Sequence, residues 1–379
     1  MKQRSSNFEL LRIIAMLMII GHHLFIHGLI HILEPVKYIA FRQGFASNKF
    51  LASLYYPGGD VGVAIFFLIT GYFAVAGGEK IRWRAIEKLV CATVFYSLLL
   101  GGLAIIAFKF GYITPAITTQ LEKLSAFIGA MLIPVSGANY WFVTVYLMLM
   151  FMAPVLNKGL LLLNKRGFRL ALFFVWVFTY LLNAMVGSKF INIYKGIFFY
   201  MFGFYIKRFY EEIKIRRFIC ILLALLGWGL YSYVVATAFD TIQSDKLFSE
   251  IIRVYGQPFA MGLLVPAIAV SLFLLFSRLD IGTKGFINGI ASTCFGVYLL
   301  HDFAIFRQGI WNYIFKVDSL QFNSPYFVFT SLATVLILFI VLSLIDMARI
   351  KILQPIYLKA VDKLFAFLRR KYLADETRA

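Results

Sequence analysis

Long apolar segments separated by short charged or glycine-rich loops run through almost the whole chain. Each segment is close to the length of about twenty residues that a helix needs to cross the hydrocarbon core of a bilayer. We therefore predict an all-α, polytopic membrane protein. Breaking the chain at its loops gives about ten transmembrane helices, at residues 8–33, 60–77, 89–108, 140–161, 168–186, 194–210, 217–239, 256–277, 286–306 and 327–348.

Two further segments differ from this pattern. Residues 124–135 are apolar but short for a crossing and include Pro134, which predicts an interfacial or re-entrant piece. Residues 351–373 predict an amphipathic helix with basic edges, of the kind that lies on a membrane surface and is attracted to anionic headgroups. We therefore divide the chain into a transmembrane domain, 1–350, and a cytoplasmic basic tail, 351–379. The tail's apolar face holds Leu364, Phe365 and Leu368, and its edge holds Lys363, Arg369 and Arg370.

Composition strengthens the membrane interpretation. The 379 residues are 61% hydrophobic and 15% charged, whereas a soluble domain carries roughly a quarter charged residues. The net charge of +19 would suggest nucleic-acid binding in a soluble chain, but lysine and arginine also hold the cytoplasmic loops of membrane proteins in place. With both termini in the cytoplasm, the predicted cytoplasmic segments carry about 25 basic residues and the external loops about 11. We expect a multi-pass protein of the cell membrane that binds no nucleic acid.

The cysteines and the amino terminus suggest nothing further. Cys91, Cys220 and Cys294 are far apart in apolar segments, with neither metal-ligand spacing nor a disulfide framework. The basic start and apolar run resemble a signal peptide, but no small-residue cleavage site follows. We expect the first helix to be retained.

The first predicted helix concentrates ionisable side chains, which are costly inside a membrane and mark functional sites. Arg12 and His23 are eleven residues apart, which is three helical turns and places them within about 20° of each other. His27 lies about 40° further round, and His22 about 80° from Arg12 on the other side. We predict that only one of His22 and His23 faces a site, and that His23 does. The segment holds Glu9, Arg12, His22, His23, His27 and His31.

Histidine suits general-base catalysis because its ordinary pKa of about 6.5 keeps the neutral ring accessible. Simpler interpretations remain open for each residue. Arg12 could extend its charge to the interface, His23 could make a polar packing contact, and His27 and His31 could lie at the external interface.

Three other clusters contain candidate site residues. Residues 57–73 are rich in glycine, which allows close approach of a backbone or ligand. Tyr140 and Trp141 stand where an external aromatic belt is expected, so an interfacial anchor is one interpretation. Tyr298 and the adjoining His301 and Asp302 lie near the external end of the ninth helix, as a structural pair or an acceptor site.

The order of these elements resembles the family 3 membrane acyltransferases over residues 8 to about 348. Glu9-Leu10-Leu11-Arg12 followed by ten residues and His23 is similar to the family's signature, in which the histidine is considered catalytic. Residues 62–72 resemble its second-helix pattern, although Ala64 and Thr70 replace a frequent aspartate and serine. The basic loop with Arg82, Arg84 and Lys88 is similar to the family's cytoplasmic arginine motif. Residues 140–142 and 292–301 resemble the fourth- and ninth-helix patterns.

The resemblance implies transfer of an acyl group, commonly acetyl, from cytoplasmic acetyl-coenzyme A to a hydroxyl of an envelope or exported polysaccharide. Acetyl-CoA would be a co-substrate, with no bound cofactor or metal. Arg12, with Arg82, Arg84 and Lys88, would hold the donor phosphates. His23 would either deprotonate the acceptor or accept the acyl group itself. Some family members carry an extracytoplasmic esterase-like domain. The short tail here predicts action alone or with a separate partner.

Two other functions use the same kinds of residue. A transporter or flippase of an acyl group or glycan-lipid would also place arginine and histidine within the membrane. Such proteins often have two related halves, and no internal repeat is visible here. A structural or assembly role is the third possibility. Acyl transfer is the interpretation that the motifs favour.

Overall fold

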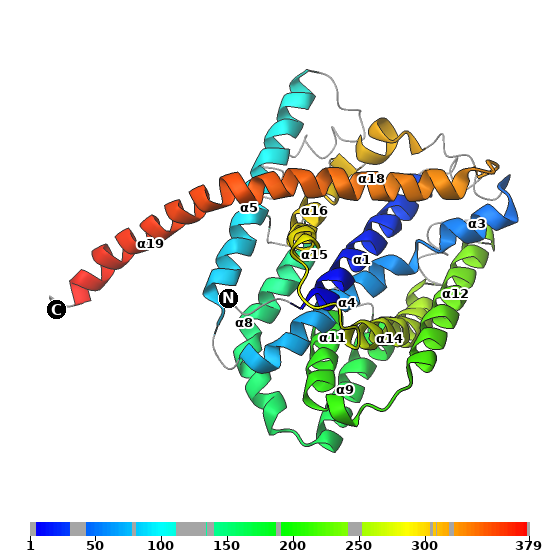
Figure 1. The fold of residues 1–379 in the computed structure, drawn as a ribbon, viewed down its shortest axis with the longest axis horizontal. Helices are drawn as coiled ribbons and strands as arrows, with labels where there is room; N and C mark the ends of the chain where they lie inside the picture. The colour runs from blue at the N-terminus through cyan, green and yellow to red at the C-terminus, as the bar shows by residue number, and fades with distance from the viewer. Residues whose placement is uncertain are drawn as a thin grey trace.

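The computed structural model describes residues 5–30, 43–77, 81–110, 134, 140–186, 191–241, 252–303, 306–307, 309–317 and 322–376. Within these residues the regular structure is helical and contains no strand (Figure 1). The predicted all-α fold is thus confirmed. The expected interfacial segment at 124–135 lies outside the described residues, apart from Pro134.

The helices follow one another with short connections. The first half contains α1 (Ser6–His23), η1 (Leu24–Leu29), α3 (Ala46–Ser53), α4 (Pro57–Ala74), η2 (Val75–Gly77), α5 (Trp83–Lys109), α8 (Trp141–Leu162), α9 (Lys165–Trp176), η4 (Val177–Leu182) and α10 (Asn183–Val186). The second half contains α11 (Ile191–Arg208), η5 (Tyr210–Glu212), α12 (Arg217–Thr241), η6 (Ile252–Leu264), α14 (Val265–Ser277), α15 (Gly285–Ala291), α16 (Cys294–His301), η7 (Gly309–Ile314), α18 (Phe327–Ala348), η9 (Arg349–Leu353) and α19 (Gln354–Glu376).

Eight helical segments in the described residues are long and apolar enough to cross a membrane, which agrees with eight of the ten predicted spans. This supports a multi-pass membrane protein, because a chain in lipid must satisfy its backbone hydrogen bonds internally. The segments are Ser6–Leu29, Ala46–Ala74, Trp83–Ala107, Trp141–Leu162, Lys165–Met185, Arg217–Phe239, Pro258–Ser277 and Phe327–Leu364.

The other two predicted spans take different forms. The span at 194–210 corresponds to α11, an 18-residue helix. Its sequence includes Lys195 near the start and Lys207 and Arg208 at the end. The span at 286–306 is not one continuous helix, because a turn separates α15 from α16. Ser292 and Thr293 donate side-chain hydrogen bonds to the carbonyls of Gly289 (2.6 Å) and Ile290 (2.7 Å) at this turn. Such local bonds compete with the helical ladder.

Helix α1 is the central element, and glycines bring its neighbours close. It packs against α4, α14, α15, α16 and α18 (Figure 1). A Cβ at Gly58 or Gly62 of α4 would collide with α1 backbone carbonyls, and one at Gly71 with the Tyr200 carbonyl of α11. The glycine-rich segment therefore permits close backbone approach on two sides of α4, as its composition predicts.

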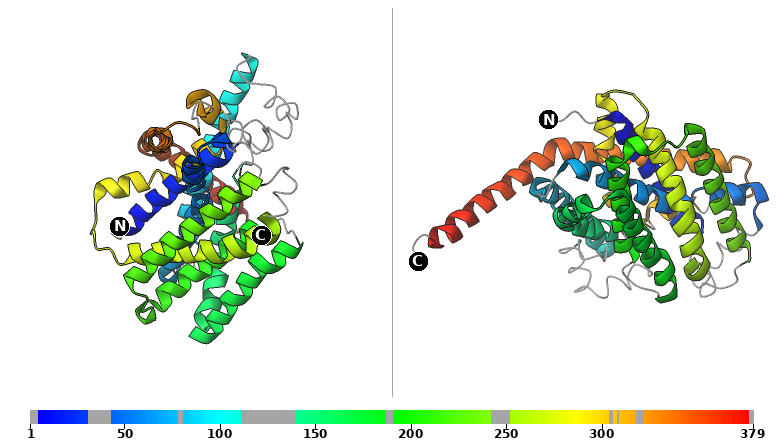
Figure 2. Two further views of the ribbon diagram at one scale, coloured as in Figure 1. Left: turned by 90° about the vertical axis from the view of Figure 1, so that its right-hand side faces the viewer. Right: turned by 90° about the horizontal axis from the view of Figure 1, so that it is seen from below.

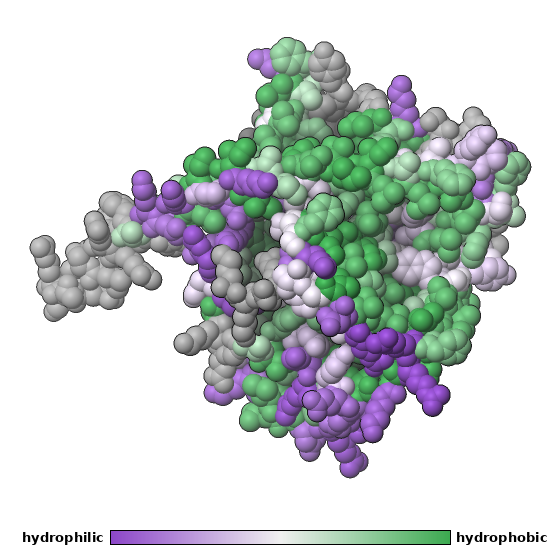
Figure 3. Space-filling view, viewed as in Figure 1, coloured by the Kyte–Doolittle hydropathy of each residue, from purple (hydrophilic) through white to green (hydrophobic). Residues whose placement is uncertain are grey.

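Polar loops gather on the side of the molecule where α1 begins. Ser6 at that end donates a backbone hydrogen bond to Gly282, in the loop before α15 (3.2 Å). Arg278 in the same loop donates to Ile215 of the loop before α12 (2.6 Å), and Lys165 of α9 pairs with Glu212. In Figure 3, hydrophilic side chains lie along the lower edge of the view, on the side where α1 begins, and an apolar surface lies over α18.

Helices α18, η9 and α19 form one long helix whose carboxyl-terminal part extends away from the other helices (Figures 1 and 2). Its 50 residues from Phe327 to Glu376 would measure about 75 Å at 1.5 Å per residue, well beyond the hydrocarbon core of about 30 Å. Some of it must therefore lie outside the hydrocarbon. The side chains of Phe365 and Leu368 on the predicted apolar face, and of Arg369 and Arg370 on its basic edge, lie outside the described part of the chain.

Candidate active site

One cavity of about 760 Å³ runs beside α1 and brings together most of the predicted site residues. Arg12 and His23 both line it, on the same side of the helix, as their spacing predicts. Eleven residues of helix separate them by about 16 Å, so the cavity extends over a large part of the membrane's depth. Helices α4, α5, α8, α11, α14 and α16 supply most of the remaining wall, and η1, η4, η6, α15, η9 and α19 add one or two residues each.

The end of the cavity near Arg12 is basic. We call it the basic end and define it by Arg12, Lys88 and Arg349, all of which line the cavity. Arg12 Nη1 lies 2.7 Å from Glu9 Oε1, and Arg349 Nε lies 2.6 Å from the buried Asp346 Oδ1. Glu9 and Asp346 do not line the cavity, so the charges presented to a ligand here are positive.

The wall between Arg12 and His23 is mainly apolar. An apolar wall excludes water and suits an extended part of a ligand that carries few charges. It is formed by Met16, Ile19, Val63, Ala64, Phe66, Phe67, Phe142, Met150 and Phe295.

At the other end, the charged side chains occur in pairs of opposite sign. We call this the paired end and define it by Asp60, Lys195, Asp302 and Arg307, all of which line the cavity. Lys195 Nζ lies 3.1 Å from Asp60 Oδ1, and Arg307 Nη2 lies 2.8 Å from Asp302 Oδ1. The formal charges of these four side chains cancel.

His23 is oriented by His301, which comes from α16. His301 Nδ1 lies 2.6 Å from the Val297 carbonyl oxygen, which can only accept, so this nitrogen carries a hydrogen. In the neutral ring, Nε2 of His301 is then an acceptor, and it lies 2.9 Å from His23 Nδ1. His23 Nδ1 must therefore donate, which leaves the lone pair of its Nε2 free to take a proton. His301 is fully buried, so this tautomer is set by the protein interior.

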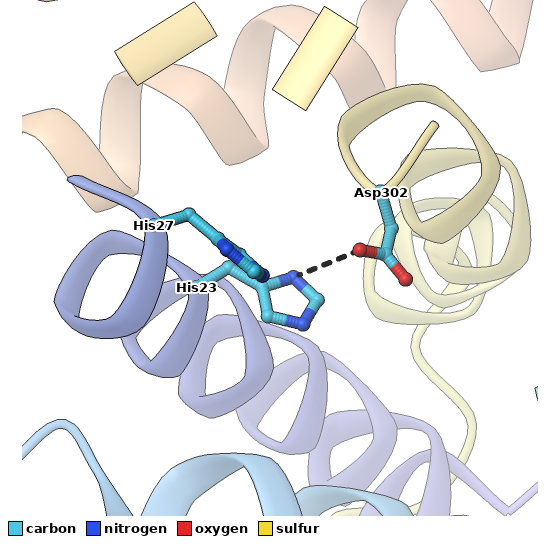
Figure 4. Close-up of side chains that lie close together, drawn as sticks. All are labelled: His23, His27 and Asp302. Carbon is cyan, nitrogen blue, oxygen red and sulfur yellow. Dashed lines mark ion pairs between the residues drawn. The ribbon is translucent and has the colours of Figure 1, made fainter. Parts of the chain in front are cut away.

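Asp302 adds a negative charge on the same side of His23. Its Oδ1 lies 3.8 Å from His23 Nδ1 (Figure 4), too far for a hydrogen bond but close enough to stabilise a protonated ring. Arg307 holds this carboxylate in place through its 2.8 Å ion pair. A base oriented by a neighbour and backed by an acid is the arrangement that nucleophilic and general-base catalysis require.

An alternative interpretation is that these side chains bind a metal ion. Ligand atoms of His23, His27 and Asp302 all lie within 4.8 Å of one another (Figure 4), and imidazole and carboxylate suit divalent transition metals. However, His23 Nδ1 is already bonded to His301, and Asp302 is already paired with Arg307. Coordination through those atoms would break both contacts, so the geometry favours the hydrogen-bonded arrangement.

The prediction that only one of the two adjacent histidines faces the site is wrong. His22 also lines the cavity, because the cavity is broad enough to reach two sides of α1. Its Nδ1 lies 2.6 Å from the Tyr56 carbonyl oxygen, so it too carries a hydrogen there and leaves Nε2 as an acceptor. A Cβ at Gly59 would collide with the His22 ring, so this glycine makes room for it.

The remaining predicted residues differ in their positions. His27, Trp141 and Tyr298 line the cavity, while Glu9 does not line it and pairs with Arg12. Tyr140 is fully buried and donates to the Leu299 carbonyl (2.8 Å), which fixes α8 against α16.

Two of the basic loop residues lie away from the cavity. Arg84 is exposed and pairs with Glu87 (2.8 Å) and with Asp362 of α19 (2.7 Å). Arg82 is likewise exposed and is not part of the cavity wall.

Sequence reasoning missed several residues of the wall. Lys195 was a detectable signal, since it is a lone charge within an apolar segment. Arg349 follows Asp346, which lies behind the wall, by three residues, the spacing of an intrahelical ion pair. Tyr180 had no signal, being one of 21 tyrosines.

One comparison with known proteins found a match. A family model described as an acyltransferase domain matches residues 5–344, nearly the whole chain. The match includes every residue of the cavity wall except Arg349, Ile350 and Gln354. No curated protein and no solved structure was found to match the chain.

Proposed function

The chain belongs to the acyltransferase 3 family, and on that premise we propose that it transfers an acetyl group from cytoplasmic acetyl-CoA to a hydroxyl of a cell-envelope glycan. The observation that carries the proposal is the cavity in which Arg12 and His23 lie about 16 Å apart along one helix. One end of the cavity suits an anion, and the other holds an oriented base.

The basic end supports an acyl-CoA donor. CoA carries phosphates, which arginine and lysine bind through charge-assisted hydrogen bonds. Arg12, Lys88 and Arg349 face the cavity together, and the amino-terminal end of α16 at Cys294 lies beside Arg12. Helix amino termini also favour anions. The apolar wall beyond suits the long, uncharged arm that connects the phosphates of CoA to its thioester.

His23 supports the chemical step. Its Nε2 would take the proton of the acceptor hydroxyl while that oxygen attacks the thioester carbonyl carbon. The carbon–sulfur bond then breaks, and the leaving thiolate takes the proton from His23 to give free CoA. Asp302 would stabilise the transient imidazolium, and His301 would hold the ring in the reactive tautomer.

The proposed orientation places the basic end at the cytoplasm, where acetyl-CoA is available. The loops and helix ends on that side carry Lys165, Arg208, Arg216 and Arg217, as the positive-inside rule predicts for a cytoplasmic side. A reporter fused after Arg217 should therefore be cytoplasmic. An external reporter at this site would reverse the orientation and contradict the proposed route of the donor.

Thiol release by the purified protein tests the function. In detergent, with acetyl-CoA and O-deacetylated envelope polysaccharide from the organism that encodes it, the parent should release CoA thiol and O-acetylate the polysaccharide. His23→Ala should do neither, although it elutes from size exclusion like the parent. An inactive parent that moves substrate across liposomes in a His23-dependent way would instead identify a transporter. A stable acetyl-enzyme formed without acceptor would replace direct transfer with an acyl-histidine route.

A further inference from the structure

Asp60, Lys195 and Tyr180 form a polar pocket at the paired end that the proposed reaction does not yet use. Asp60 Oδ1 accepts from Lys195 Nζ (3.1 Å), and Asp60 Oδ2 accepts from Tyr231 Oη (3.3 Å). Asp60 and Lys195 line the cavity and keep 21% and 16% of their side-chain surface accessible. An ion pair at this depth is costly to insert, and its exposure to a cavity points to a substrate pathway.

Tyr180 provides an independent observation at the same place. Its side chain is completely buried yet lines the cavity, and among the described residues its hydroxyl has no hydrogen-bond partner. A buried hydroxyl without a partner costs free energy, which a ligand hydroxyl would recover. An ion pair that merely fastens α4 to α11 would explain Asp60 and Lys195, but it would leave Tyr180 unexplained.

From these groups we infer that the paired end binds the acceptor as an uncharged, hydroxyl-rich sugar ring. Asp60 and His22 Nε2 accept hydrogen bonds from ring hydroxyls, while Lys195 and Tyr180 donate to ring oxygens. Trp141, which also lines the cavity, offers an apolar face for the C–H surface of the ring.

The charge balance of the paired end selects against charged sugars. Asp60 is neutralised by Lys195, and Asp302 by Arg307. A sugar carboxylate would enter a poorly solvated site whose two cations are already paired, and a sugar amine would meet two carboxylates that are already paired. An uncompensated charge in such surroundings is unfavourable. A neutral sugar needs no counter-charge.

Tyr180→Phe is the sharpest test, because it removes only a hydroxyl that has no partner among the described residues. The inference rests on the proposed acetyl transfer, so both substrates are varied in the thiol-release assay. The acceptors are oligosaccharides from the O-deacetylated envelope polysaccharide, separated by anion exchange into neutral and acidic fractions. Tyr180→Phe should raise the KM for the neutral fraction about 3- to 10-fold, leave the KM for acetyl-CoA within about twofold and not lower the Tm.

Asp60→Asn should raise the acceptor KM further, because the hydrogen bonds that the Asp60 carboxylate accepts are charged.

Tyr233→Phe, at an exposed tyrosine of α12, is the matched control and should leave both KM values as in the parent. An active parent whose acceptor KM is unchanged in Tyr180→Phe and Asp60→Asn would overturn the inference, as would equal rises in the KM of both substrates. A parent that acetylates only the acidic fraction would overturn the neutral class of acceptor. A parent that releases no thiol with either fraction would instead contradict the proposed function.

Discussion

The two ends of the cavity use charge in opposite ways. At the basic end, the cationic groups of Arg12, Lys88 and Arg349 line the cavity, while the acids Glu9 and Asp346 stand behind them. At the paired end, acids and bases line the wall together and cancel. Both ends offset the cost of placing charge in a membrane by pairing acids with bases, but they differ in which of these groups faces the cavity. One end is left attractive to an anion, and the other is polar without favouring either sign.

The largest effect should come from His23, which lies at the paired end beside His301 and Asp302. Replacing it with glutamine keeps a polar side chain but removes the base. We expect kcat to fall by about 10²- to 10⁴-fold while the KM values of both substrates change little. Initial rates over both substrate concentrations will measure this. Loss of donor binding in His23→Gln would mean that the two ends are not functionally separate.

Arg12 should give the next largest effect, confined to the donor. Arg12→Lys keeps the charge but loses the planar fork that binds phosphate at two points. Losing a charged hydrogen bond of about 1.5–3 kcal/mol corresponds to a rise in donor KM of about 10- to 100-fold. The acceptor KM should stay near that of the parent. If neither Arg12→Lys nor Arg12→Ala alters the donor KM, Arg12 serves only its ion pair with Glu9 or its position at the interface.

Arg84 should have a much smaller effect than Arg12, although both are basic and both were predicted to bind the donor. Arg84 is exposed, pairs with Glu87 and Asp362, and does not line the cavity. Exposed ion pairs contribute little, so Arg84→Ala should raise the donor KM by less than about twofold. A rise as large as that in Arg12→Lys would show that the donor extends beyond the cavity and contacts this loop.

The smallest effect is expected from a chelator. If His27, Asp302 and His23 held a divalent cation, the paired end would gain positive charge. The paired end would then no longer be charge-balanced, and it would not differ from the basic end in this way. Because His23 and Asp302 are already engaged by His301 and Arg307, EDTA should leave thiol release unchanged. Inactivation by EDTA that zinc reverses, with metal detected in the purified protein, would assign a metal site instead.

The site was only partly predictable from the sequence, and α1 illustrates the limit. The phase of a single helix correctly placed Arg12 and His23 on one side, because both residues belong to one regular element. The same reasoning wrongly excluded His22, since helical phase gives a direction but not the width of the cavity that faces it. Local periodicity predicts orientation. The shape of an enclosed space depends on the neighbouring helices.

Partners that are distant in sequence were beyond the same reasoning. Asp60 belonged to the glycine-rich segment and Lys195 to a segment more than a hundred residues later, and only the packing of α4 on α11 brings them together. His301 was predicted to belong to a structural pair or an acceptor site, whereas its contact with His23 orients the base. Arg349 was not among the predicted site residues, whereas it forms part of the basic end.

The sequence by itself determined that this is a helical membrane protein, since apolar segments of this length in lipid must satisfy their own backbone hydrogen bonds. It also determined the side of α1 that carries Arg12 and His23, because that depends only on the helical repeat. The tertiary structure decided which charges are paired and which tautomer His23 adopts. Those properties depend on atoms brought within about 3 to 4 Å from distant parts of the chain, and no local pattern specifies such distances.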